Sequence, residues 1–505
     1  MDLTSIARWI MARRVKAAHS WAGNTPEVQR AQLKAMIHAA RNTEWGEAHG
    51  YRNIRSYEEY AANVAVTPYD KLRPMVMRMI QGEKDVLWPG RVYRYAQSSG
   101  TSDGKSKYIP ISNEGLNRNH YRGAADTVAH YLHMHPESKM FSGKGFILGG
   151  SFANGLKEVP KGVRVGDLSA HLIDSITPAA ELMRTPSKST ALLNSWETKL
   201  PRLVNESIQS NVTNLSGVPS WFLTVLRRVL ETTGAKELHE VWPGLEVFFH
   251  GGISFKPYRE QYDAIIDPCR MRYMETYNAS EGFFALQDNP ELHTMLLLMD
   301  AGVFYEFIPV EHPESRPIPT WELEAGKTYA MVITTCSGLW RYPIGDTVTV
   351  HSTNPVRITI AGRTKCFINA FGEEVMVHNA DAAIAAACSA TDASVKDYTA
   401  APVFTAEKTK GRHEWLIEFD REPANIFEFA AILDRELQKV NSDYEAKRGG
   451  NIFLDRPSVV KAAPGLFDKW LGMTGKLGGQ SKVPRLANDR RIIDQLLDLN
   501  IENKK

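Results

Sequence analysis

Hydrophobic and polar positions follow two different periods along this chain. In the first 87 residues apolar side chains recur every three or four positions, as at Leu33, Met36 and Ile37, which predicts helices. Residues 92–96 and 108–111 instead alternate apolar with polar side chains, which predicts two short strands joined by a loop. The pattern therefore indicates a helical region followed by the first strands.

Strands and helices alternate along the rest of the chain. Helical spacing recurs at 112–135 and 172–240, and strand-like runs lie at 146–151, 245–252, 271–277, 294–308 and 328–335. Beyond about residue 355, the pattern predicts helices at 380–390 and 426–440 and strands at 403–405 and 415–419. This alternation is typical of an α/β fold.

A domain boundary is expected where residues 362–365 stand between two apolar stretches. We therefore expect a large N-terminal domain over residues 1–361, with β-sheets and packed helices. A small, mobile α+β domain is expected over residues 362–505, which is an acceptable domain size. Near its end, the glycine-rich stretch 475–485 carries two lysines, one of which is Lys482.

Charge and composition exclude few functions. The 505 residues include 60 Lys and Arg against 58 Asp and Glu, so nucleic acid and an anionic membrane are not indicated as partners. The first helix is basic and amphipathic, but Arg8, Arg13 and Arg14 interrupt its apolar runs, so it has no signal-peptide core. No stretch approaches the ~18 apolar residues of a membrane span. A cytoplasmic location is expected.

The most distinctive stretch is the loop between the first two predicted strands. Its glycines and hydroxyls can direct several donors at one anion, and its lysines favour phosphate oxygens. Three residues separate its two glycines, whereas the Walker pattern needs four, and by composition alone a flexible hairpin loop is the simpler interpretation. The candidate phosphate-binding residues are Ser98, Ser99, Gly100, Thr101, Gly104 and Lys105.

Three later corners follow strand-like runs. The first is a glycine pair, at the kind of strand end where open α/β sheets bind ligands. The glycine pair is Gly251 and Gly252. The second site contains Tyr277, Ser280 and Glu281, which form either a corner that faces a ligand or a polar turn with a capping serine. The third contains Asp346, which is either an acidic group that binds a ribose diol or part of a simple hairpin turn.

Candidate metal ligands are few. Asp126, His130 and His133 fall on one face of a predicted helix, but no obvious further ligand completes a site, so solvated or core histidines are the favoured interpretation. The four cysteines have neither the spacing of metal ligands nor the number of a disulfide framework.

Three motifs in this order resemble those of one known family. They are SSGTSDGKSK at 98–107, YNASEG at 277–282 and LWRYPIGD at 339–346. They resemble the nucleotide motifs of the Gretchen-Hagen acyl acid amido synthetases, which belong to the adenylate-forming superfamily of acyl-CoA synthetases and firefly luciferase. Residues 66–74 and 475–486 also resemble family sequence.

The resemblance implies a two-step reaction. A small carboxylic acid would attack the α-phosphorus of MgATP to give an acyl-adenylate, and an amine, usually an amino acid, would then displace AMP. It implies that the loop at 98–105 holds the β,γ-phosphates, Tyr277 and the glycine pair flank adenine, and Glu281 binds Mg²⁺. The remaining implied roles are ribose binding by Asp346 and secondarily Arg363, a hinge at Lys365, and catalysis by Lys105, Glu281 and Lys482.

The chain departs from the family pattern in places. Asn278 stands where the superfamily often has glycine, and Lys365 stands where aspartate is usual at the hinge. The chain is shorter than the plant proteins, which puts plant-hormone substrates in doubt but not adenylation. We expect a monomeric, bacterial-type member of the family. The alternatives are an acid–thiol ligase that uses coenzyme A and a non-catalytic nucleotide-binding protein.

Overall fold

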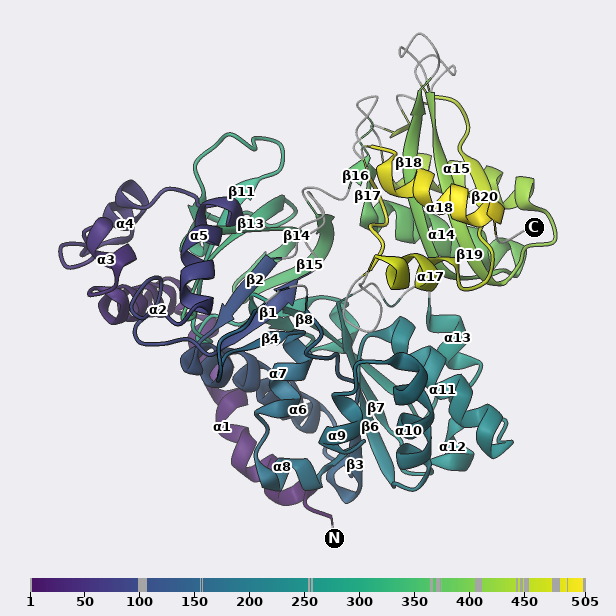
Figure 1. Ribbon diagram of the computed structural model, residues 1–505, viewed down its shortest axis with the longest axis horizontal. Coiled ribbons are helices and arrows are strands. Elements are labelled where there is room, and N and C mark those ends of the chain that lie inside the picture. Colours follow the sequence, from purple (N-terminus) through teal and green to yellow (C-terminus); the bar gives the residue numbers. More distant parts are fainter. Residues whose placement is uncertain are drawn as a thin grey trace. The chain divides into compact units, whose positions relative to one another are not determined.

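The computed structural model describes residues 2–98, 107–154, 156, 158–252, 255, 258–363, 367–368, 373, 375–404, 411–441, 444–445, 448, 454–474, 482–487 and 489–502. The chain forms two compact units (Figure 1). The first comprises Met1–Gly252 and Ile266–Ile360, and the second comprises Ile253–Ile265 and Ala361–Lys505. The division expected from the sequence, after residue 361, would place residues 253–265 in the larger domain. The structure assigns them to the smaller one, because Tyr258 Oη donates to the Lys396 carbonyl at 3.0 Å within that unit.

The predicted helical start of the chain is confirmed. The helices are α1 (Thr4–Ala22), α2 (Thr25–Ala40), α3 (Glu44–Ala48), α4 (Tyr57–Asn63) and α5 (Tyr69–Ile80). The side chains of Thr43 and Ser56 begin α3 and α4 by accepting the backbone N–H of Gly46 and Glu59, which otherwise lack partners in the first turn. Among the described residues, no helix combines the length and apolarity that crossing a membrane requires.

A twelve-stranded mixed sheet runs through the first unit. Its order is β12-β11-β13-β14-β15-β10-β9-β8-β7-β6-β3-β5. The strands β5, β3, β6, β7 and β8 are parallel, so their carboxyl ends share one edge. The bounds are β3 (Lys144–Ile147), β5 (Arg184–Thr185), β6 (Val212–Gly217), β7 (Val247–Gly251), β8 (Arg272–Ala279), β9 (Gly282–Leu286), β10 (Met295–Leu297), β11 (Val303–Pro309), β12 (Ile318–Pro319), β13 (Thr328–Thr335), β14 (Tyr342–Thr353) and β15 (Val356–Arg363).

A smaller sheet, in the order β2-β1-β4, carries the first motif. Its strands are β1 (Arg94–Ser98), β2 (Lys107–Ile111) and β4 (Arg164–Gly166). The two predicted strands around the loop are confirmed as an antiparallel pair in which Ser98 lies opposite Lys107. The intervening residues 99–106 lie outside the described part of the chain.

The two predicted helical regions are interrupted. Residues 112–135 begin with a π-helical turn, η1 (Gly115–His120), before α6 (Tyr121–Met134), and Ser112 Oγ caps the start by accepting from Gly115 N at 2.8 Å. Residues 172–240 include the strands β5 and β6, which the sequence did not reveal because β6 is short and mixes polar with apolar residues. The helices here are α7 (Leu168–Asp174), α8 (Pro178–Leu182), α9 (Lys188–Ala191), α10 (Trp196–Ile208), α11 (Pro219–Thr233) and α12 (Leu238–Val241), and short 3-10 turns are η2 (Met140–Ser142), η4 (Pro290–Leu292) and η5 (Thr320–Glu322).

The second unit packs helices on both faces of a three-stranded sheet, in the order β18-β19-β20. Trp415 and Ile417 face one apolar cluster, whereas Leu416 between them faces another, as the two-residue period of a strand requires. The elements are α13 (Arg259–Asp263), β16 (Phe367–Ile368), β17 (Val375–Met376), α14 (Val377–Thr391), β18 (Ser394–Phe404), β19 (Gly411–Arg421), α15 (Ile426–Val440), β20 (Ser458–Lys461), α17 (Leu466–Met473) and α18 (Arg491–Glu502).

Candidate functional site

Two sequence motifs meet directly in the first unit. Tyr277, in β8, donates its hydroxyl to Asp346 Oδ2, in β14, over 2.6 Å, and both side chains are buried. Three strands separate β8 from β14 in the order of the sheet, so the sheet curls to bring these side chains together. A phenol and a carboxylate that lie far apart in the sequence therefore form one polar corner.

A β-bulge gives Asp346 its direction. Gly345 has φ +89°, a conformation that favours glycine, and the pairing of β13 with β14 shifts register between Ala330 and Val332, opposite this glycine. The hairpin interpretation of Gly345-Asp346 is wrong, because β14 continues on both sides of the irregularity. Bulges redirect side chains in this way without ending a strand.

The carboxylate of Glu281 lies beside the base of the first motif's loop. Glu281 Oε1 lies 3.5 Å from Tyr342 Oη, which accepts a hydrogen bond from Lys107 Nζ at 3.1 Å. Lys107 Nζ also lies 5.8 Å from the ring centroid of Tyr69, within the range of a cation–π contact. Because Lys107 pairs with Ser98 across the loop, the loop begins and ends close to Glu281.

The charge of Glu281 also affects the neighbouring phenol of Tyr69. Burial raises the pKa of Tyr69 to about 12, and the negative charge of Glu281 contributes to this increase. Tyr69 therefore stays a neutral hydrogen-bonding group: its hydroxyl donates to the carbonyl of Tyr108 and accepts from the N–H of the same residue. These bonds attach α5 to β2.

The glycine pair lies at the carboxyl end of β7. A side chain on Gly251 would place its Cβ 2.4 Å from the carbonyl oxygen of Thr276, which immediately precedes Tyr277. Gly252 has φ +79°, in the left-handed region that favours glycine. Gly251 therefore needs glycine because the chain passes close to β8, and Gly252 needs it because of its backbone conformation.

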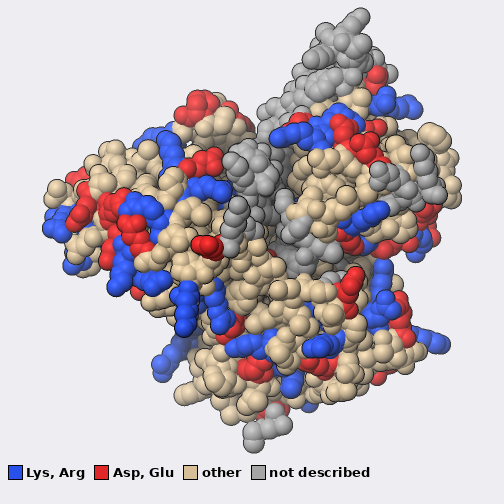
Figure 2. Space-filling view, viewed as in Figure 1, with Lys and Arg blue, Asp and Glu red and all other residues tan. Residues whose placement is uncertain are grey.

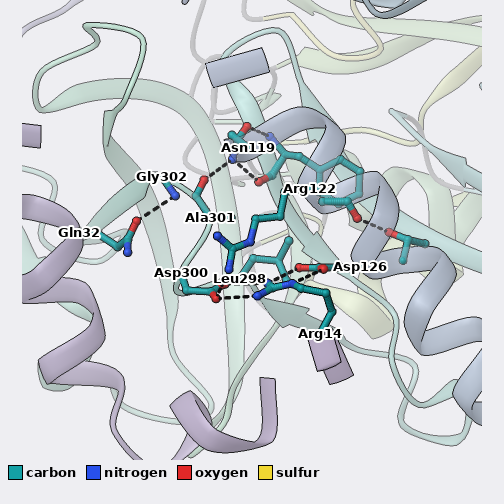
Figure 3. A network of polar contacts seen from close by, with 12 residues as sticks. Arg14, Gln32, Asn119, Arg122, Asp126, Leu298, Asp300, Ala301 and Gly302 are labelled. Atoms are coloured by element: carbon teal, nitrogen blue, oxygen red, sulfur yellow. Dashed lines mark hydrogen bonds and ion pairs between the residues drawn. The ribbon is translucent and has the colours of Figure 1, made fainter. Parts of the chain in front are cut away.

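The π-helical turn supports the β8–β9 corner. Asn119 Nδ2 donates to the carbonyls of Phe283 and Ala301, and Asn119 Oδ1 accepts from Phe283 N at 2.7 Å (Figure 3). Burial lowers the pKa of the adjacent His120 to about 4, although a hydrogen bond with Asn278 opposes this shift. A neutral histidine therefore lies against the second motif.

The remaining predicted site residues are placed less fully. Ser280 lies half-buried in the turn between β8 and β9, and Lys482 lies half-exposed in the second unit. Ser98 and Arg363 end β1 and β15, but their side chains fall outside the described parts. The predicted residues outside the described part of the chain are Ser99, Gly100, Thr101, Gly104, Lys105 and Lys365.

The histidine-rich face of α6 has another arrangement. Asp126 pairs with Arg14 at 2.7 Å, and burial lowers the pKa of His130. Across the described ranges, no group of three His, Cys, Asp or Glu side chains could hold a metal ion. The half-exposed Glu281 carboxylate nevertheless suits Mg²⁺, which typically takes one or two carboxylates together with substrate phosphates and waters.

Sequence reasoning missed two supporting residues. Tyr342 links Lys107 to Glu281, and its position inside the third motif was the available signal. Asn119 has no comparable signal, because only the fold reveals that it contacts strands more than 160 positions away along the chain.

The architecture is shared with solved structures of an acyl acid amido synthetase and of a CoA ligase. The fold is similar to that of the GH3.15 acyl acid amido synthetase in complex with 2,4-DB, with a TM-score of 0.79 and 18% identity over 96% of this chain and 95% of that chain. It is also similar to 2-hydroxyisobutyryl-CoA ligase in the postadenylation state, with a TM-score of 0.60 and 13% identity over 94% and 91%.

The chain belongs to the GH3 family. Residues 14–271 match the GH3 family N-terminal domain, 296–363 the central domain and 378–491 the C-terminal domain. The family resemblance and the predicted fold class are therefore confirmed.

Several related proteins carry names that describe amide synthesis. The chain is 23% identical to the jasmonoyl–L-amino acid synthetase GH3.5 of Oryza sativa subsp. japonica, over 65% of this chain and 69% of the relative. It is 22% identical to the indole-3-acetic acid-amido synthetase GH3.3 of Arabidopsis thaliana, over 65% of each chain. A probable indole-3-acetic acid-amido synthetase, GH3.1 of Oryza sativa subsp. japonica, matches at 21% identity over 95% of this chain and 90% of the relative.

Proposed function

We propose that this chain is an ATP-dependent, AMP-forming acyl acid amido synthetase. The observation that carries the proposal is the Tyr277–Asp346 hydrogen bond beside a corner that contains Glu281, because this arrangement gathers the second and third motifs into one site. Family membership and the amide-forming names of the relatives support the choice of reaction.

The first step is adenylation. A carboxylate oxygen attacks the α-phosphorus of ATP, the bond to the bridging oxygen of the β-phosphate breaks, and pyrophosphate leaves. Asp346 accepts hydrogen bonds from the ribose hydroxyls, with Arg363 as a second candidate, and Tyr277 lies against adenine beside the Gly251-Gly252 turn. The first motif's loop holds the β,γ-phosphates with its N–H groups and hydroxyls, and positioning of this kind is the main catalysis available to such transfers.

Charge is balanced at the phosphates. Glu281 would hold Mg²⁺, which when bound neutralises the charge that develops on the phosphate oxygens. Lys105 contributes a cation from the loop, and Lys482 contributes one from the second unit during adenylation. Movement of this unit about Lys365 between the two steps is part of the proposal and belongs to the class of gating motions.

The second step forms the amide. The amine nitrogen attacks the acyl carbon, AMP leaves with the electron pair of the acyl–phosphate bond, and the amine releases a proton. The names of the relatives favour an amino acid as acceptor. We further propose a monomeric, cytoplasmic, bacterial-type enzyme that uses acids other than plant hormones. The low identity to the plant relatives, 21% to 23%, supports acids other than plant hormones.

The test is a screen of carboxylic acids for ATP–pyrophosphate exchange, followed by mass detection of the conjugate with amino acids. The expected result is acid-dependent exchange, AMP as nucleotide product, and an amide with at least one amino acid.

ADP formation would contradict adenylation. A thioester formed with coenzyme A, and no amide with any amino acid, would establish the alternative of an acid–thiol ligase. The similarity of the fold to 2-hydroxyisobutyryl-CoA ligase is the reason to test this alternative. ATP binding without exchange for any acid would favour a non-catalytic protein. Sedimentation measurements test the monomer.

A further inference from the structure

The first half of helix α1 exposes three large apolar side chains. Ile6, Trp9 and Ile10 are 58%, 76% and 60% exposed, although large side chains of this kind are usually covered. They follow the three- and four-residue spacing that places side chains on one face of a helix. The helix therefore presents an apolar face outward in its first half.

Polar bonds attach α1 to the first unit, together with the buried side chains of Val15, Ala18 and Trp21 on its inner face. Arg14 bonds to both oxygens of Asp126 at 2.7 Å and to Asp300 at 3.1 and 3.2 Å (Figure 3). Arg8 Nε donates to the carbonyl of Leu132 at 3.2 Å. Bidentate arginine–carboxylate pairs of this geometry fix orientation, so the outward face is held in place.

The same outward face is basic. Arg13 and Lys16 continue the spacing of the apolar residues and are exposed, and neither forms an ion pair within the described residues. Residues 4–22 contain no Asp or Glu. Elsewhere the charges are mixed: on the face drawn in Figure 2, Lys and Arg are interspersed with Asp and Glu. The near-zero net charge of the whole chain conceals this local excess.

We propose that the outward face of α1, defined by Ile6, Trp9, Ile10, Arg13 and Lys16, binds an anionic lipid surface. A helix with apolar and aromatic side chains beside basic ones lies in the interface plane, with the apolar groups among the acyl chains and the cations at the headgroups. Tryptophan suits this boundary because its ring is apolar and its N–H remains hydrogen-bonded. The absence of acidic residues in α1 matches the negative potential of such a surface. The proposed binding is peripheral, and it rests on the local charge of α1, whereas the expectation of no membrane partner rested on the net charge of the whole chain.

The test is cosedimentation of the full chain with vesicles of phosphatidylcholine alone and of phosphatidylcholine mixed with phosphatidylglycerol. Binding is expected with the mixed vesicles and is expected to weaken as salt rises. Trp9→Ala is expected to lower the partition coefficient at least about tenfold, given the transfer free energy of a large apolar side chain. Arg13→Gln and Lys16→Gln are each expected to lower it about fivefold.

Leu182→Ala is the matched control, because Leu182 is 75% exposed on α8, outside this face, and its loss is expected to leave binding unchanged. Thermal melting of each variant checks that the fold is retained. Absence of wild-type binding to the mixed vesicles would overturn the proposal. So would equal binding by wild type and Trp9→Ala, or self-association of the chain that Trp9→Ala abolishes, since the latter would place a second copy on this face.

Discussion

Tyr277 Oη lies 2.6 Å from Asp346 Oδ2, and this hydrogen bond joins the second motif to the third. A carboxylate has room for about four acceptor contacts, so the bond orients Asp346 without exhausting it. The phenol thereby fixes the direction of the carboxylate. Binding of a ribose diol requires such a fixed acceptor, because a vicinal pair of hydroxyls must be met by two lone pairs at once.

Replacing Asp346 tests its role toward ribose. Asp346→Ala is expected to cost about 1.5–3 kcal/mol of transition-state stabilisation, which is the range for hydrogen bonds to a charged group, so kcat/KM for ATP is expected to fall roughly 10- to 150-fold. The sharper measurement is discrimination between ATP and 2′-deoxy-ATP, measured by pyrophosphate exchange. Wild type is expected to prefer ATP, and the variant is expected to lose most of that preference.

Tyr277→Phe serves as the partner variant. It keeps the ring but removes the donor to Asp346, so a smaller loss with partial discrimination is expected. An undiminished preference for ATP in Asp346→Ala would show that Asp346 has only a structural role.

Replacing Glu281 tests the metal. Glu281→Gln keeps the size of the side chain but removes its charge, so the concentration of Mg²⁺ that half-saturates exchange is expected to rise and the maximal rate to fall at least about a hundredfold. ATP binding, followed by calorimetry, is expected to persist. Glu291→Gln is the control, because Glu291 is an exposed carboxylate in the turn η4, outside the second motif. Unchanged Mg²⁺ dependence in the Glu281 variant would refute the assignment.

Replacing Lys482 separates the two half-reactions. Lys482→Ala is expected to depress adenylation, measured by pyrophosphate exchange, at least about tenfold more than it depresses conversion of supplied acyl-adenylate to amide. The reason is that its cation would act on the charge that develops at the phosphates. The exposed Lys469→Ala provides a control on the same unit. Equal loss in both steps would indicate a folding role instead.

His120 makes the free energy of unfolding depend on pH in the acid range. Burial lowers its pKa from 6.5 to about 4, so between these pH values the unfolded state binds a proton that the folded state does not. Stability is therefore complete above about pH 6.5 and falls as the pH decreases toward 4, by on the order of 3 kcal/mol for this group.

The measurement is the free energy of unfolding by denaturant across this pH range. His120→Gln is expected to flatten the acid dependence even where it lowers stability overall. His312→Gln, at an exposed position, is expected to leave the slope unchanged. An identical slope in wild type and His120→Gln would contradict the prediction.

The strands and motifs could be predicted largely from local pattern. The β1–β2 pair and the strand at 271–277 follow from the alternation of apolar and polar residues, and a helix was predicted close to the position of α15. The strand β6 could not be predicted, since its six residues are strand-forming only between β3 and β7. The bulge at Gly345 is a property of pairing with β13, which local sequence does not encode. The support from Asn119 likewise depends on contacts that only the folded chain creates.

Because residues 253–265 belong to the second unit, the ribosome makes this unit in two separate parts. The ribosome releases this segment first and then makes the 95 residues from 266 to 360 before the rest of its unit begins. Until Lys396 has been made, Tyr258 at the start of α13 lacks the carbonyl to which it donates, and the small unit cannot complete its packing. Such long-range pairing slows folding, because the intervening chain must be closed into a loop first. A gene fragment that starts at residue 361 would therefore encode an incomplete unit with the surface for α13 exposed.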